Sequence, residues 1–159
     1  MGYTGTKKKE KETLKKEKKK TVSKADTKIK EKKQSKSDKL KVIPLGGVDG
    51  IGMNMTLLEH GDDIIAIDCG VAFPEDDMPG VDLVIPDFTY LLRNAEKVRG
   101  LVLTHGHEDH IGATPYVLRQ VPMDLYGTKL TLALVDLKLK EHRINNIEMN
   151  MVEPGDTVQ

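Results

Sequence analysis

The chain has 159 residues, and its 25 basic and 25 acidic side chains give a formal net charge of zero. That balance hides a division: residues 1–40 hold 16 lysines and 6 acidic residues, a net charge of +10, whereas residues 41–159 have a net charge of −10. The length allows one domain after the basic segment, no apolar run is long enough to span a membrane, and a single cysteine excludes a disulfide framework.

Residues 1–40 contain few apolar side chains that folding could bury, so the sequence predicts a disordered, lysine-rich tail. Two functions stay open for this tail. Either it binds phosphate groups through counterion release, without sequence readout, or it is a solvated segment with no specific partner. No apolar stretch follows the N-terminal charges, so no secretory signal is predicted, and we expect a cytoplasmic location.

Residues 41–159 combine strand and helix patterns, which predicts an α/β or α+β domain. A strand over 42–45 leads into a glycine-rich loop over 46–52, whose spacing does not fit a nucleotide-binding loop and predicts a tight turn. Strands over 53–59 and 63–68 are expected to form a hairpin. The later predictions are a strand over 81–85, a helix from Pro86 to Leu92 capped by Asp87, a strand over 98–104, a helix over 111–120 with Pro115 in its first turn, a strand over 124–126, a helix over 128–142 with Leu130, Leu134, Leu137 and Lys138 at helical spacing, and a strand over 146–152.

The segment after the buried strand over 98–104 carries the chemistry. His105, His107, Asp109 and His110 place three imidazoles and one carboxylate within six residues. On an extended segment His105 and His107 point to the same side and can bind one metal ion, and Asp109 and His110 can face a second ion where the chain turns into a helix. These ligand types suit Zn²⁺, with Mn²⁺ and Fe as alternatives.

Other polar side chains have different predicted roles. Asp68 follows an apolar strand, where its carboxylate can accept a hydrogen bond from a ligand histidine; the alternative is an ordinary turn or helix cap. His60, in a polar turn, and His142, at a helix C-terminus, are predicted to be structural. Cys69 is predicted to be a small buried residue, because no base is paired with it.

The motif His105-x-His107-x-Asp109-His110, preceded by Asp68, resembles the metallo-β-lactamase superfamily. Longer strings resemble the ribonuclease J family within it, over about Leu40 to Gln159. Asp49-Gly50 departs from the Gly-Glu usual in that family, outside the ligand motif. The matching strings are Leu45-Gly-Gly, Ile51-Gly-Met-Asn54, Ile67-Asp-Cys-Gly with Phe73-Pro-Glu, Gly80-Val-Asp-Leu-Val-Ile-Pro-Asp87, and Thr104-His-Gly-His-Glu-Asp-His-Ile-Gly-Ala113 with Pro115-Tyr-Val-Leu-Arg119.

The resemblance implies the N-terminal part of a four-layer αββα fold with an inserted β-CASP domain, in an enzyme with 5′→3′ exonuclease and endonuclease action on RNA. It implies two zinc ions, with Mn²⁺ as an alternative. His105 and His107 would bind the first and Asp109 and His110 the second, and all four would act in catalysis through the metals. Gly80, through its carbonyl, and Asp82 match positions that bind a structural calcium ion in some members. The implied partners are RNA and either further copies of the chain or a paralogous subunit, with no membrane.

The family pattern needs further histidines and a bridging carboxylate downstream, and the only histidine after His110 is His142. We therefore expect an N-terminal fragment, with a tail over 1–40 and part of the catalytic domain over 41–159, that is inactive by itself. Two alternatives remain open. One is another metallo-β-lactamase-fold hydrolase acting on a small ester, thioester or lactam, and the other is a non-catalytic RNA-binding partner subunit.

Overall fold

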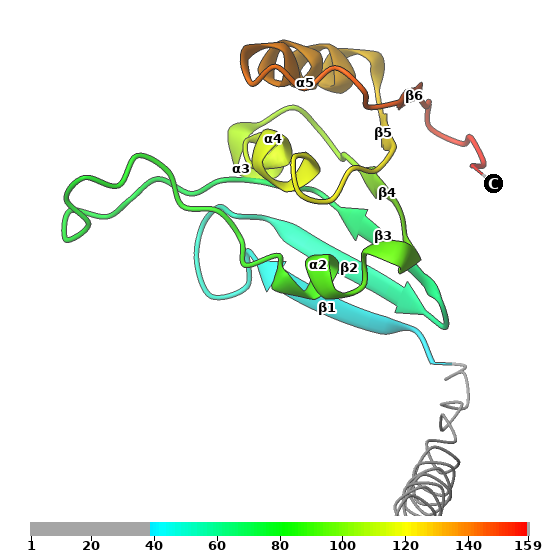
Figure 1. The fold of residues 1–159 in the computed structure, drawn as a ribbon, viewed down its shortest axis with the longest axis horizontal. Helices are drawn as coiled ribbons and strands as arrows, with labels where there is room; N and C mark the ends of the chain where they lie inside the picture. The colour runs from blue at the N-terminus through cyan, green and yellow to red at the C-terminus, as the bar shows by residue number, and fades with distance from the viewer. Residues whose placement is uncertain (1–38, 159) are drawn as a thin grey trace, which may run out of the picture. The chain divides into compact units, whose positions relative to one another are not determined.

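The computed structural model describes residues 39–158, so the predicted tail lies outside the described residues except for its last two positions. Six strands form one sheet in the order β1-β2-β3-β4-β5-β6 (Figure 1). The first three strands pair antiparallel, and β3 to β6 run parallel. The strands are β1 (Lys41–Gly46), β2 (Met55–His60), β3 (Asp63–Ile67), β4 (Val98–Val102), β5 (Leu125–Gly127) and β6 (Met149–Met151).

Within residues 39–158, short helices connect the strands, and only α5 is long. None of the helices within residues 39–158 has the length and apolar character that crossing a membrane requires. The predicted mixed α/β class is confirmed. The helices are α2 (Thr89–Arg93), the 3₁₀ helix η1 (Ala95–Lys97), α3 (Glu108–Ile111), α4 (Thr114–Leu118) and α5 (Lys129–Glu141).

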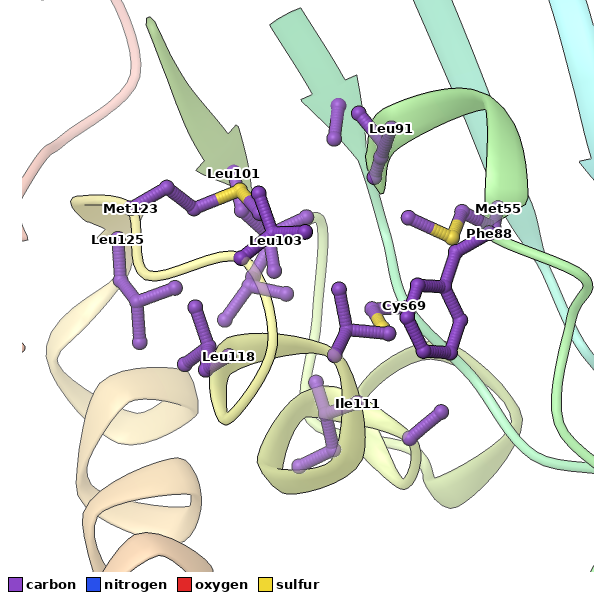
Figure 2. Close-up of a cluster of buried hydrophobic side chains, with 14 of the residues drawn as sticks. Met55, Cys69, Phe88, Leu91, Leu101, Leu103, Ile111, Leu118, Met123 and Leu125 are labelled. Carbon is purple, nitrogen blue, oxygen red and sulfur yellow. The ribbon is translucent and has the colours of Figure 1, made fainter. Parts of the chain in front are cut away.

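The core forms where alternate strand residues meet the apolar sides of the helices. Met55 and Leu57 of β2 and Ile64 of β3 are buried, whereas their sequence neighbours lie on the opposite face of the sheet. Figure 2 shows side chains from β4, from the loop after β3 and from the segment around α3 gathered in one cluster. The labelled members are Met55, Cys69, Phe88, Leu91, Leu101, Leu103, Ile111, Leu118, Met123 and Leu125. Burial of Cys69 agrees with its predicted role.

The predicted strand over 81–85 is wrong. The segment lies in a loop that extends away from the sheet (Figure 1), and only Val84 pairs, in an isolated bridge with Ala72. An apolar run becomes a strand only where a neighbouring strand accepts its backbone hydrogen bonds, and here Ala72 alone does so.

All three predicted helices differ in detail from the structure. The helix predicted from Pro86 to Leu92 is α2, which begins at Thr89, and Phe88 rather than Asp87 holds the N-cap position, although the Asp87 carboxylate accepts from the Thr89 N–H at 2.9 Å. The helix predicted over 111–120 is divided into α3 and α4. Helix α5 forms as predicted, but its Leu130, Leu134 and Leu137 are exposed. The helix carries a second apolar stripe, and this stripe faces the core: Leu132, Val135 and Leu139.

A buried carboxylate joins the edge strand β1 to α2 and η1. Glu59 of β2 accepts hydrogen bonds from the Tyr90 hydroxyl at 2.5 Å and from Lys41 Nζ at 3.1 Å, and Lys97 Nζ lies 3.6 Å away. The hydrogen bond from Tyr90 holds the pKa of Glu59 below its usual value, with both lysines acting in the same direction and burial opposing them. A carboxyl group with a depressed folded-state pKa stabilises the fold above its unfolded-state pKa, and this contribution is lost as the pH falls through the folded-state value.

We predict that Glu59→Gln lowers the free energy of unfolding by about 1–3 kcal/mol at neutral pH, because a charged acceptor is replaced by a neutral one. The deficit should begin to shrink below about pH 4.5, where the carboxyl group of the unfolded chain takes up a proton, and should disappear as the pH falls through the lower folded-state pKa. Urea unfolding of both proteins across this pH range measures the effect, with the exposed Glu141→Gln as control. A deficit that does not change with pH would contradict the prediction.

Candidate metal centre

The site forms where the parallel strands β3 and β4 end side by side. Ile67 is in register with Val102, and the backbone N–H of Asp68 donates to the Val102 carbonyl at 2.9 Å. The pairing therefore brings Asp68 beside Thr104, the residue that precedes His105. Asp68 has a φ of +58°, a left-handed conformation that aspartate adopts more readily than most side chains. The sheet thus sets where the histidine segment begins.

The buried Asp68 carboxylate organises that segment through three groups. It accepts hydrogen bonds from the Thr104 backbone N–H at 2.8 Å, from the Thr104 hydroxyl at 2.8 Å, and from His110 Nδ1 at 2.8 Å. Because a carboxylate accepts, the His110 proton lies on Nδ1 and the lone pair lies on Nε2. His110 is thereby prepared to bind a metal through Nε2, the arrangement typical of ligand histidines.

The rings of His105 and His107 meet with their ligand atoms close together. His105 Nε2 lies 3.1 Å from His107 Nδ1, and Thr104 Oγ1 lies 3.0 Å from the other nitrogen of His105. Two nitrogens bound to one tetrahedral zinc ion at 2.0–2.1 Å would lie about 3.3 Å apart. The spacing of this pair therefore fits two ligands of one ion.

Asp109 and His110 form a second pair of the same kind. Asp109 Oδ2 lies 3.4 Å from His110 Nε2, again near the separation expected for two ligands of one zinc ion. The two pairs are adjacent, since the His105 and His110 ring centroids lie 4.1 Å apart. Within residues 39–158 no three or more His, Cys, Asp or Glu side chains are arranged to hold one ion, so each pair supplies two donors where zinc usually takes four.

The backbone of the loop after β3 lies directly against the turn that carries the ligands. Cys69 N–H donates to the His110 carbonyl at 2.7 Å, and Val71 N–H donates to the Glu108 carbonyl at 3.1 Å. Between them, Gly70 approaches so closely that an added Cβ would lie 1.6 Å from the Asp109 carbonyl oxygen. Only a residue without a side chain fits there, and the close approach fixes the position of Asp109.

The other residues considered from the sequence lie elsewhere. His60 ends β2 in the exposed hairpin turn, and His142 follows α5 with its ring against Tyr116. Gly80 and Asp82 lie in the exposed loop between Ala72 and Val84. In the described part of the chain, Asp82 joins no group of three metal-binding side chains, and the structure does not test the calcium prediction.

Two residues without a predicted role also support the ligand pairs. Thr104 links Asp68 to His105, and the Asn54 amide contacts both Asp109 and His110. Thr104 could have been found from its place directly before the first histidine. Asn54 gives no such signal, because 55 residues separate it from Asp109.

Comparison with protein families gives a match to the model described as "Metallo-beta-lactamase superfamily" over residues 48–140, which include Asp68 and all four ligand candidates. Among solved structures, a diphosphatase of the PhnP family aligns with a TM-score of 0.51 and 18% identity, covering 72% of this chain and 51% of that one. At this identity the likeness concerns the fold alone.

Among curated proteins, ribonuclease J 2 of Staphylococcus saprophyticus is 48% identical over 112 residues, 70% of this chain. Ribonuclease J of Synechocystis sp. is 44% identical over 129 residues, 80% of this chain. These similarities confirm the resemblance to ribonuclease J. The chain spans 20% of the length of each of these two relatives.

We predict that Gly70→Ala lowers the free energy of unfolding by at least about 3 kcal/mol, because its Cβ would overlap the Asp109 carbonyl. Gly50→Ala is the matched control, since an added Cβ at Gly50 meets no atom within 4 Å. Chemical unfolding of both variants measures the difference. Equal stability of the two variants would show that the loop and the ligand turn are not held together as described.

Proposed function

Because the chain belongs to the metallo-β-lactamase superfamily, we propose that His105, His107, Asp109 and His110 form half of a two-zinc site in a metal-dependent ribonuclease. Divalent metal binding is the chemistry that the superfamily shares. We propose in addition that the metal is zinc and that the substrate is RNA. Two distances support the proposal: 3.1 Å between His105 Nε2 and His107 Nδ1, and 3.4 Å between Asp109 Oδ2 and His110 Nε2. They occur in a chain that is 48% identical to a ribonuclease J over 112 residues.

The residues of this chain would act by holding the ligand atoms ready. Asp68 keeps the His110 proton on Nδ1, and Thr104 bridges Asp68 to His105, so little reorganisation accompanies metal binding. When bound, the metals supply activated water and balance the negative charge that develops on the phosphate. The backbone contacts of Gly70 keep Asp109 beside His110.

The proposal requires ligands from outside residues 39–158, because each pair offers two donors. We propose that the complete protein is a cytoplasmic ribonuclease with 5′→3′ exonuclease and endonuclease action, acting as a homo-oligomer or with a paralogous subunit. Mn²⁺ is the alternative metal. A structural calcium ion at the Gly80 carbonyl and Asp82 is a further part of the proposal, while the 159-residue chain by itself would not cleave RNA.

In the full-length protein, we predict that His107→Ala lowers the rate of RNA hydrolysis by on the order of 10³-fold, because several kcal/mol of metal-based charge stabilisation is lost. Metal analysis should show about two zinc ions per full-length subunit and less than that in the variant. His60→Ala is the matched control, because His60 lies in the exposed hairpin turn.

Three outcomes would count against the proposal. Two tightly bound zinc ions and RNA cleavage by the 159-residue chain would contradict the half-site. Hydrolysis of a small thioester or lactam in place of RNA would indicate another hydrolase of the same fold. RNA binding by a full-length protein that takes up no metal would indicate a non-catalytic subunit.

The lysine-rich tail gives a separate prediction, because residues 1–40 have a net charge of +10. Removing them from the full-length protein should weaken RNA binding mainly at low salt and reduce the salt dependence of the binding constant, as fewer counterions are released. Filter binding or fluorescence anisotropy over a salt series measures both effects. A tail with its lysines replaced by glutamine is the control for length, and unchanged affinity at low salt would leave the tail as a solvated segment.

A further inference from the structure

We infer that Asn54 is a positioning residue for the second metal ion, whose side-chain amide sets the separation and direction of the Asp109 and His110 ligand atoms. The inference rests on the proposed two-metal site and adds a residue from a distant part of the chain. Asn54 lies between the glycine-rich loop and β2, immediately before Met55.

The Asn54 amide nitrogen lies within hydrogen-bonding distance of three acceptors. Nδ2 is 2.9 Å from the Asp109 carbonyl oxygen, 3.2 Å from Asp109 Oδ2, and 3.2 Å from His110 Nε2. The last two atoms are the proposed ligands of the second ion, and the amide nitrogen is equally distant from both. One group therefore contacts the backbone of the ligand turn and both of its metal-binding atoms. His110 Nε2 has one lone pair, so this contact places the atom before metal binding and gives way to the ion, whereas the oxygens of Asp109 can keep the amide as a donor.

The chemistry of these acceptors fixes how the amide is turned. With the His110 proton on Nδ1, the Nε2 atom presents a lone pair, as do the carbonyl and carboxylate oxygens of Asp109. A flipped amide would place its own oxygen against three acceptors, so the NH₂ group must face the ligand pair. Two backbone hydrogen bonds hold Asn54 in place. Its N–H donates to the Asp109 carbonyl at 3.1 Å, and its carbonyl accepts from the Gly70 N–H at 3.0 Å.

The glycine-rich loop covers the opposite side of this amide. Gly47 has a φ of +82°, and an added Cβ there would lie 2.4 Å from Asn54 Oδ1. The loop can therefore lie directly over the Asn54 side chain only with glycine at this position. This contact gives the loop a function that its sequence pattern did not indicate: it keeps the amide against Asp109 and His110.

The test is metal loading of the full-length protein, followed without RNA. Stepwise titration of the metal-free protein with Co²⁺, monitored by visible absorption, reports affinity and ligand geometry at each position. Asn54→Leu removes both amide donors at similar volume and should weaken the second binding step by about 10–100-fold, with an altered spectrum for that step and a smaller change in the first. Asn146→Leu, at an exposed asparagine, is the matched control.

A second variant keeps the test independent of the folding of Asn54→Leu. Gly47→Ala displaces the amide from the other side and should give the same selective loss. Gly155→Ala controls for backbone strain, because Gly155 has a φ of +100° and an added Cβ there meets no atom within 4 Å.

Unchanged loading in Asn54→Leu and Gly47→Ala would overturn the inference, and so would an equal loss at both ions. If the wild-type protein binds two ions and cleaves RNA while these variants behave like it, the inference about Asn54 fails and the proposed function stands. A wild-type protein that takes up no second ion contradicts both.

Discussion

The site depends on the burial of one carboxylate. Asp68 is 6% exposed, and a charge at that depth is tolerated only when hydrogen bonds replace the lost water. Its donors come from the end of β4 and from α3, so satisfying one buried group draws two segments to the end of β3. The hydrogen bonds that pair this charge therefore also orient His110. Through Thr104, they are linked to the ring of His105 as well. Stability of the fold and geometry of the ligands follow from the same hydrogen bonds.

Close backbone contact supplies the second constraint. The loop after β3 and the turn at α3 are joined by main-chain hydrogen bonds over Cys69 to Val71. Gly70 permits the short distance between the two backbones, because it has no side chain. Asn54 joins the β1–β2 connection to the same turn. Two segments distant in the sequence thus converge on the turn that carries Asp109 and His110, whereas His105 and His107 depend mainly on the direction in which β4 ends. The second pair is consequently the one that remote substitutions can disturb without touching a ligand.

The parts of this arrangement that are local in sequence could be predicted from it. The hairpin of β2 and β3 and the apolar strand that leads into His105 follow from alternation and from turn residues. The failures concern long-range partners. Residues 81–85 have a strand-like composition but only Ala72 to pair with, and the leucines used to predict α5 belong to the stripe that faces away from the core. The same limit applies to Asn54, because contact with Asp109 arises only from the register of the folded sheet.

The charge division of the chain acquires a physical meaning under the proposed function. Asp68 and Asp109 contribute two negative charges at the site, and Lys138 of α5 is paired with Glu108 of the ligand turn at 2.7 Å. Without metal, this end of the sheet would repel RNA phosphates. Two divalent cations would reverse the sign of the local charge, so attraction of the substrate to the site and the capacity to hydrolyse it would arise together. A basic tail would draw RNA toward the acidic body through long-range attraction, and only a metal-loaded site would then retain the phosphate.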